Sequence, residues 1–183
     1  MPNRAELNPW TTLTRRLVYE NHWIAVREDE VVRPDGSPGI YGVVHYKHRA
    51  IGVLPVADDG EIWLVGQYRY TLDRYSWEIP EGGAAERETA SDAALRELRE
   101  ETGLIAGQLE RMATAHLSNS VSDEEAFVFR ATHLHQGPSA PEPTERLLVR
   151  QFTWAEAWSM FESGVITDSM SVIALLHEAI RRR

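Results

Sequence analysis

The residues best suited to chemistry are three glutamates in the segment from Gly82 to Leu104. Glu97 and Glu101 are four residues apart and Glu97 and Glu100 are three apart, so on an α-helix all three carboxylates share one side. Like charges at this spacing destabilise an isolated helix, whereas clustered carboxylate oxygens suit Mg²⁺ bound together with substrate phosphates. A glutamate-rich helix is ordinarily a solvated face, and the three residues alone leave both interpretations open.

The residues around the glutamates favour the metal-binding interpretation. They follow one fixed pattern of spacing, made up of Gly82, Glu88, Arg96, Glu97, Leu98, Glu100, Glu101, Gly103 and Leu104. This pattern resembles the complete signature of the Nudix hydrolase family, without a substitution at any fixed position. A weaker similarity to the ADP-ribose and nucleotide-sugar pyrophosphatase branch extends over most of the chain, including the segments 67–69 and 77–80.

The resemblance implies both an activity and a set of metal ligands. Members of the family cleave a nucleoside diphosphate linked to another moiety by attack of water on phosphorus, with Mg²⁺ or Mn²⁺ as the cofactor. The metal ions would neutralise the diphosphate oxygens and lower the pKa of a bound water. Glu97, Glu100 and Glu101 match the family's side-chain ligands, and the backbone carbonyl of Glu81 matches a further ligand.

The resemblance also suggests which residues assist the reaction. Arg96 matches a residue that pairs with Glu88 and orients the loop on the helix. In the ADP-ribose branch a loop glutamate after the signature helix serves as the general base, and Glu145 is in the better-matching register, with Glu142 as the alternative. Glu100 or Glu101 acting on a metal-bound water is the remaining possibility.

Seven further residues are candidates for substrate binding. Arg69 ends a predicted strand and could contact a phosphate bidentately, although a surface salt bridge explains it equally well. Arg27 lies in an N-terminal strand that resembles the nucleotide-contacting part of this branch. Aromatic rings can stack on any base, and polar residues between two strands could line the pocket. The full set is Tyr19, Trp23, Arg27, Arg69, Tyr70, Ser118 and Ser120.

The segment around Ser118 departs from the branch. Ser118-Asn119-Ser120 stands where ADP-ribose pyrophosphatases carry a proline in a Ser-Pro-Gly context. This difference leaves other nucleotide sugars, such as GDP-mannose, open as the preferred substrate.

The elements that position these residues can be predicted from apolar patterning and turn residues. Asp58-Asp59-Gly60, between two apolar runs, is the strongest hairpin signal, and Gly103 is placed to end the central helix. Strands are expected at 13–20, 23–33, 40–46, 51–57, 61–69, about 109–117, 124–133 and 146–154, and helices at about 88–102, 154–163 and 169–181.

This order of elements predicts an α+β fold with a mixed sheet between helices. The resemblance refines it to the α/β/α sandwich of the Nudix fold with additional N-terminal antiparallel strands. Residues 1–48 are predicted to form a strand-rich dimerisation element, and residues 49–183 the catalytic domain. The family resemblance further implies a homodimer with exchanged N-terminal strands.

Composition limits the other possibilities. The 183 residues carry 19 basic and 28 acidic side chains, a net charge of −9, which disfavours binding along a nucleic-acid backbone. The absence of cysteine excludes disulfides, thiolate zinc sites and cysteine nucleophiles. No signal peptide or membrane span is expected, so a cytoplasmic protein with no membrane partner is predicted.

The sequence therefore predicts metal-dependent hydrolysis of nucleoside diphosphate sugars, of the ADP-ribose or GDP-mannose type, to a nucleoside monophosphate and a sugar phosphate. One alternative is a Nudix hydrolase of dinucleoside polyphosphates or nucleoside triphosphates. Another is a non-catalytic sensor of nucleotide sugars, although such proteins usually lose signature glutamates.

Overall fold

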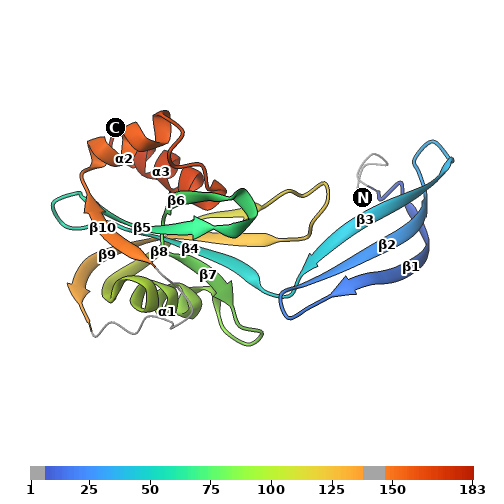
Figure 1. Cartoon of the computed structure of the whole chain (residues 1–183), viewed down its shortest axis with the longest axis horizontal. Coiled ribbons are helices and arrows are strands. Elements are labelled where there is room, and N and C mark those ends of the chain that lie inside the picture. The colour runs from blue at the N-terminus through green and yellow to red at the C-terminus, as the bar shows by residue number, and fades with distance from the viewer. Residues whose placement is uncertain (1–6, 138–146) are drawn as a thin grey trace. The chain divides into compact units, whose positions relative to one another are not determined.

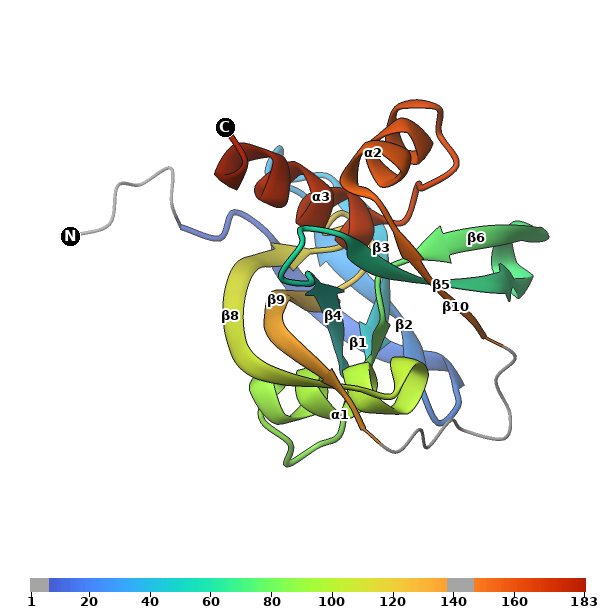
Figure 2. The same cartoon turned by 90° about the vertical axis from the view of Figure 1, so that its left-hand side faces the viewer.

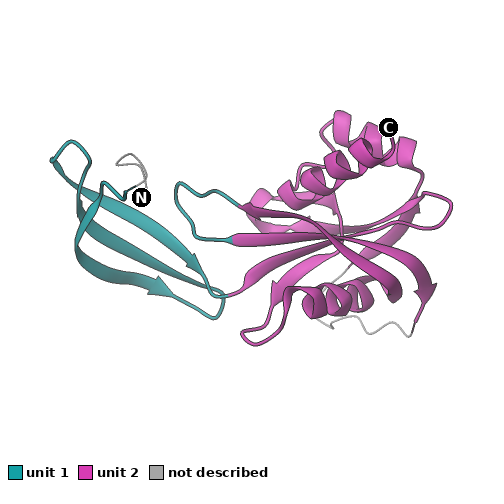
Figure 3. Ribbon diagram, turned by 180° about the vertical axis from the view of Figure 1, so that it is seen from behind, with its two compact units in different colours: residues 1–47, 117–124 teal, residues 48–116, 125–183 magenta. Residues whose placement is uncertain are grey.

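The computed structural model describes residues 7–137 and 147–183, which fall into two units. The first unit contains the N-terminal residues up to Lys47 together with Leu117–Glu124, and the second contains His48–His116 and Glu125–Arg183 (Figure 3). The boundary predicted at residue 48 takes no account of the 117–124 segment.

The first unit is a three-stranded antiparallel sheet with the order β1-β2-β3. Its strands are β1 (Thr11–Glu20), β2 (Ile24–Val32) and β3 (Pro38–Tyr46) (Figure 1). The predicted turn between the last two strands is present, with Gly36 in the left-handed conformation at φ 84°. Among the described residues of this unit only Asp29 and Val31 are buried.

The 117–124 segment adds to the end of β3. The backbone NH of Val44 donates to the Val121 carbonyl at 2.8 Å, and the NH of Asp123 donates to the Val44 carbonyl at 3.2 Å. The Asp123 carboxylate also lies 2.6 Å from Nδ1 of His45. These bonds link residues nearly 80 positions apart in the chain.

The second unit contains two sheets. The four-stranded sheet has the order β7-β4-β9-β8, with β4 parallel to β9 and the other pairs antiparallel. The three-stranded sheet has the antiparallel order β10-β5-β6. The strands are β4 (Arg49–Pro55), β5 (Ile62–Arg69), β6 (Arg74–Glu78), β7 (Glu81–Ala84), β8 (Leu104–His116), β9 (Glu125–Gln136) and β10 (Leu148–Phe152).

The predicted hairpin between β4 and β5 is wrong. The turn itself forms, because the Gly60 NH donates to the Ala57 carbonyl at 2.9 Å. The two strands share a single bridge, between Val56 and Ile62, and then enter different sheets. Strand β4 pairs with β7 and β9 and strand β5 with β6 and β10, so both edges of each strand are already occupied.

The described residues of the second unit also form three α-helices, as predicted: α1 (Ala90–Thr102), α2 (Trp154–Glu162) and α3 (Ser169–Arg181). Helix α1 begins after its N-cap Thr89 and ends at Gly103, which has a φ of 72°. Asp168 caps α3, because its side chain accepts a hydrogen bond from the Ser171 NH. Helix α1 covers one face of the four-stranded sheet and α3 covers the other (Figures 1 and 2). The α+β fold with a mixed sheet between helices is therefore confirmed.

Hydrophobic packing fixes α1 against the sheet. Ala93, Ala94 and Leu98 are fully buried and pack against Ile51 of β4 and Phe129 of β9. Burying such side chains contributes on the order of 1.5–3 kcal/mol each for the larger ones. None of the helices in the described residues is long and apolar enough to cross a membrane.

Candidate active site

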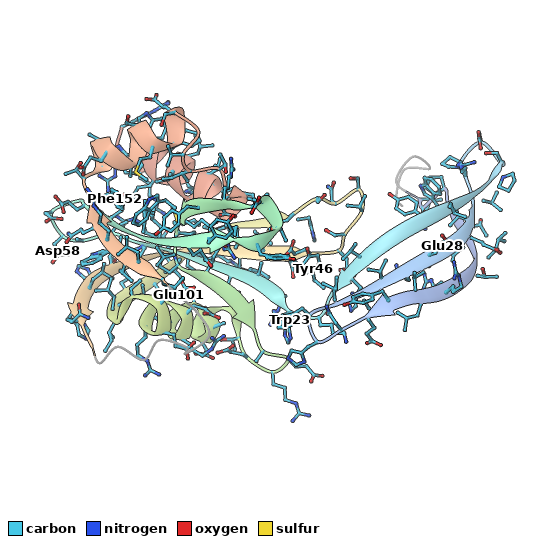
Figure 4. All side chains as sticks on the ribbon, viewed as in Figure 1. Trp23, Glu28, Tyr46, Asp58, Glu101 and Phe152 are labelled. Carbon is cyan, nitrogen blue, oxygen red and sulfur yellow. The ribbon has the colours of Figure 1, made fainter. Side chains whose placement is uncertain are left out.

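Helix α1 carries the glutamates on and beside its packed side. Glu97 and Glu101 are only 9% and 8% exposed, and Glu100 is partly exposed. Figure 4 labels Glu101 on this helix. Carboxylates are rarely buried without a partner, so packing alone does not account for these two residues.

The start of strand β7, which the sequence suggested would be a loop, lies against these carboxylates. The backbone NH of Glu81 donates to Oε2 of Glu101 at 3.1 Å. A Cβ on Gly82 would lie 2.2 Å from Oε1 of Glu97, so only glycine allows the backbone to approach so closely. The backbone at the start of β7 and the two buried carboxylates therefore form one site.

Arg96 forms hydrogen bonds with several groups on the opposite side of this site. Its guanidinium donates to both carboxylate oxygens of Glu88 at 2.9 Å and to the carbonyl of Gly83 at 2.9 Å. It also donates to Glu97 at 2.7 Å and to Glu100 at 2.9 Å. The bond with Arg96 lowers the pKa of Glu88. Arg96 therefore pairs with Glu88 as expected, and its orienting role stays a prediction.

The donor set of the site suits a hard divalent cation. Carboxylate oxygens and a backbone carbonyl are ligands that Mg²⁺ accepts, and the glycine at position 82 leaves the backbone next to Glu97. Within residues 7–137 and 147–183, no three acidic or histidine side chains are grouped closely enough to hold an ion as they stand.

Arg69 lies at the end of β5 and pairs with two buried carboxylates. Its Nε donates to Glu78 at 3.0 and 2.9 Å, and its Nη2 donates to Glu78 at 2.5 Å and also to Glu81. The side chain of Arg69 remains 34% exposed, against 2% for Glu78 and 9% for Glu81. Within the described residues, the hydrogen bonds of Arg69 run through Nε and Nη2, so Nη1 is available to a phosphate.

The electrostatics of this cluster are unusual because three carboxyl groups surround one guanidinium. Burial raises the pKa of Glu81 well above its ordinary value, and the neighbouring carboxylates of Asp168 and Glu78 raise it further, against the opposing effect of Arg69. One oxygen of Glu81, Oε2, is buried and accepts no hydrogen bond.

The aromatic candidates and Arg27 lie at exposed or half-exposed positions. Tyr19 and Trp23 belong to the first unit and are 54% and 66% exposed, and Tyr70, in the 3₁₀ turn Tyr70–Leu72 of the second unit, is 93% exposed. Arg27 pairs with Asp29 at 3.3 Å. Exposure is compatible with stacking or phosphate contact, and these roles stay predictions.

The remaining candidates are placed as follows. Ser118 and Ser120 lie in the first unit, where the Ser118 carbonyl accepts bonds from the turn and the Ser120 carbonyl accepts one from the Tyr41 hydroxyl at 2.8 Å. Glu142 and Glu145 lie outside the described residues, so the general base stays a prediction.

The sequence analysis did not single out Glu78 or Asp168 as part of the site, nor the side chain of Glu81. The only local signal is an acidic residue inside the segment Trp77-Glu78-Ile79-Pro80, where a buried strand normally has apolar residues. Asp168 is recognisable only as a helix cap.

Comparisons with known proteins agree with this geometry. Residues 10–44 match the family model of the nucleoside diphosphate sugar hydrolase N-terminal domain, and residues 46–169 match that of the NUDIX domain. The chain is 30% identical over 166 residues to an ADP-ribose pyrophosphatase of Bacillus subtilis (strain 168), covering 90% of this chain and 89% of the relative. It is 30% identical over 168 residues to an ADP-ribose pyrophosphatase of Mycobacterium tuberculosis, covering 90% and 81%.

A solved structure has a closely similar fold. A protein described as an ADP compounds hydrolase superimposes with a TM-score of 0.85 over 97% of both chains, at 19% sequence identity. At this identity the match supports the fold.

Proposed function

Because the chain belongs to the Nudix family of hydrolases, we propose that it hydrolyses the pyrophosphate bond of ADP-ribose and related nucleoside diphosphate sugars in a reaction that depends on divalent metal ions. Both ADP-ribose pyrophosphatase relatives match this chain over most of its length, and an N-terminal domain of nucleoside diphosphate sugar hydrolases matches residues 10–44. These similarities support the substrate class.

One observation carries the proposal: two nearly buried carboxylates lie against the start of strand β7, where the close approach of Glu97 leaves room only for glycine at position 82. Glu97 faces Gly82, and Glu101 accepts the backbone NH of Glu81. Burying two like charges on one helix side is costly unless a cation or hydrogen bonds compensate for it. The arrangement is suited to concentrating positive charge next to a bound diphosphate.

The residues of the chain have separate roles in the proposed reaction. Glu97, Glu100 and Glu101, with the Glu81 carbonyl, hold the divalent ions, and Arg96 orients two of these carboxylates. When bound, the ions supply positive charge that offsets the repulsion between the diphosphate and an attacking hydroxide.

The chemical step is the hydrolysis of a phosphoric anhydride. The water oxygen forms a bond to phosphorus, and its proton passes to a carboxylate, for which Glu145 remains the predicted base. The bridging oxygen leaves with the electron pair of the broken P–O bond. The products are a nucleoside monophosphate and a sugar phosphate.

A substrate panel tests the proposal. The full chain is incubated with Mg²⁺ and with ADP-ribose, GDP-mannose, UDP-glucose, diadenosine polyphosphates or 8-oxo-dGTP, and release of nucleoside monophosphate is measured. We expect turnover of one or more nucleoside diphosphate sugars and its loss when a chelator removes the metal. Turnover restricted to the polyphosphates or the triphosphate, or binding without turnover, would contradict the proposal and favour one of the alternatives.

We also propose that the first unit mediates formation of a homodimer. Every residue of β1 is exposed, and large exposed apolar patches normally mark an interface. The exposed apolar residues on its strands and their connections include Leu13, Leu17, Val18, Tyr19, Trp23 and Ile40. This exposed apolar surface, on a sheet with two buried side chains among its described residues, supports burial against a second copy of the chain.

Light scattering after gel filtration tests the dimer. The wild-type chain is expected to elute as a dimer, and Leu17→Glu is expected to dissociate it. Thr14→Glu is the matched control, because positions 14 and 17 lie on opposite faces of the strand. A monomeric wild-type chain at micromolar concentration would rule out this interface.

The predicted cytoplasmic location stays a prediction.

A further inference from the structure

We propose that the side chain of Glu81 is a positioning residue, which anchors its own peptide group to Arg69 and so holds the metal-binding carbonyl and Gly82 against helix α1. The inference rests on the proposed function, because it concerns the metal site of that reaction. Position 81 precedes the fixed signature, which begins at Gly82.

The backbone of Glu81 is already held on one side by helix α1. Its NH donates to Oε2 of Glu101 at 3.1 Å, and its carbonyl precedes the glycine that lies against Glu97. A change of a few tenths of an ångström at this residue therefore moves the carbonyl relative to the carboxylates. Divalent ions, Mg²⁺ in particular, are sensitive to such changes in ligand geometry.

The side chain of the same residue is held by strand β5. Nη2 of Arg69 donates to Oε1 of Glu81 while the other bonds of this guanidinium fix Glu78. The pairing of β5 with β6 places Arg69 opposite Arg74 at the end of the strand. Arg69 is thus a rigid anchor, because Glu78 accepts three of its hydrogen-bond contacts and is 2% exposed.

Helix α3 contacts the residues around Glu81 from a third direction. The Ile79 NH donates to Oγ of Ser171 at 2.9 Å, and the carboxyl group of Asp168, which caps the same helix, lies next to that of Glu81. Oε2 of Glu81 is buried without a hydrogen-bond partner. A carboxyl group in this place costs desolvation free energy that an apolar side chain of the same length would avoid, so simple packing does not explain it.

Three elements far apart in sequence therefore meet at one residue. Strand β5 holds the side chain of Glu81, α1 holds its NH, and α3 holds the residues before it. The remaining backbone atom, the carbonyl, is the one that the family resemblance makes a metal ligand. The side chain of Glu81 fixes the orientation of this carbonyl. Glu81 therefore acts as a positioning residue and does not contact the substrate directly.

Substitutions at position 81 test this role in the full chain. Glu81→Gln keeps an acceptor for Arg69 and adds an NH₂ group that can donate to Asp168. Glu81→Met keeps the length and removes both polar atoms. Mn²⁺ affinity is measured without substrate by electron paramagnetic resonance, and kcat and KM for ADP-ribose are measured separately.

We expect Glu81→Gln to bind Mn²⁺ nearly as tightly as the wild type. Glu81→Met should bind it about 10-fold more weakly, a loss typical of removing a residue that orients a metal ligand, with kcat reduced more than KM is raised. Equal Mn²⁺ affinity in the Met variant, the Gln variant and the wild type would overturn the inference.

A second variant keeps the test decisive if Glu81→Met does not fold. Glu81→Asp keeps the charge but shortens the side chain by one methylene, so it cannot reach Arg69 with the carbonyl in place. Weakened Mn²⁺ binding supports the positioning role, and wild-type binding refutes it. Because this readout needs no substrate, a wild-type chain that binds Mn²⁺ but hydrolyses no nucleotide sugar would contradict the proposed function alone.

Discussion

Gly82 and Glu97 approach each other so closely that no side chain fits between them. A Cβ at position 82 would lie 2.2 Å from Oε1 and 2.3 Å from Cδ of Glu97. The carboxylate cannot simply swing away, because Oε1 of Glu97 accepts a bond from Arg96 at 2.7 Å. The contact makes the position of a predicted metal ligand depend on the absence of a side chain at the start of the neighbouring strand β7.

Gly82→Ala is therefore expected to reduce activity more than stability. The added methyl group displaces Glu97 from its place, and we expect kcat/KM to fall on the order of 10–100-fold, as for a disturbed ligand-orienting contact. Gly83→Ala is the matched control, because its Cβ would meet Cβ and Cγ of His48 at the ordinary contact distances of 3.4 and 3.9 Å. Equal activity of the two variants would show that the Gly82 contact is unimportant.

Glu101→Gln is expected to remove catalysis while leaving the fold intact. The amide oxygen can still accept the Glu81 NH, now 3.1 Å from Oε2, but the neutral group binds a hard cation weakly. We expect kcat to fall on the order of 100-fold or more. Nucleotide binding, measured by calorimetry, should survive. Retained turnover would exclude a metal-binding role for this residue.

The pairing of Glu88 with Arg96 predicts a pH dependence of stability. The bond with Arg96 lowers the pKa of Glu88 below its ordinary value of 4.5, so the folded state binds this proton less tightly than the unfolded state does. The stabilisation is therefore complete above about pH 4.5 and is lost as the pH falls through the lowered pKa.

Urea denaturation of the wild type and of Glu88→Gln measures this effect. The difference between their free energies of unfolding should be larger at pH 7 than at pH 3.5, because the glutamine cannot titrate. A difference that stays constant over this range would mean that the ion pair does not contribute through its charge.

Glu178 is expected to be important for stability and not for catalysis. It is 2% exposed and accepts bonds from Arg130 at 2.7 Å and from Arg182 at 2.9 Å. Glu178→Gln removes the charge between two guanidinium groups, and we expect a loss of about 2–3 kcal/mol. This loss is at or below the lower end of the range of destabilisation caused by breaking a buried ion pair, because the two arginine side chains are 23% and 25% exposed.

The control for this prediction is the exposed pair formed by Glu110 and Arg181, whose side chains are 45% and 39% exposed. Glu110→Gln should cost less than about 1 kcal/mol. Both variants should keep wild-type kcat. Equal destabilisation by the two substitutions, measured by urea denaturation, would disprove the special role of Glu178.

The central helix and its glutamates could be predicted from the sequence because their signals are local. The spacing of the three glutamates and the glycine at position 103 act within one or two turns of the helix. The antiparallel N-terminal strands were similarly evident from a turn and two apolar runs.

The strands that pair with β4 and with β5 could not be predicted in this way. The Asp58-Asp59-Gly60 turn forms, but a turn does not determine which strands pair with the two strands that it connects. Strand β4 takes β7 and β9 as partners, and β9 begins at Glu125. Such pairings depend on the whole sheet, and the local pattern carries no information about them.

By itself the sequence determined the kind of chemistry, since the type and spacing of residues along one helix define which ligands face one side. Only the tertiary structure decided how those ligands are supported. Arg69 ends strand β5, Glu81 begins strand β7 and Asp168 caps helix α3, and only folding brings their charges together. Their burial, and therefore the strength of their electrostatic interactions, exists only in the folded protein.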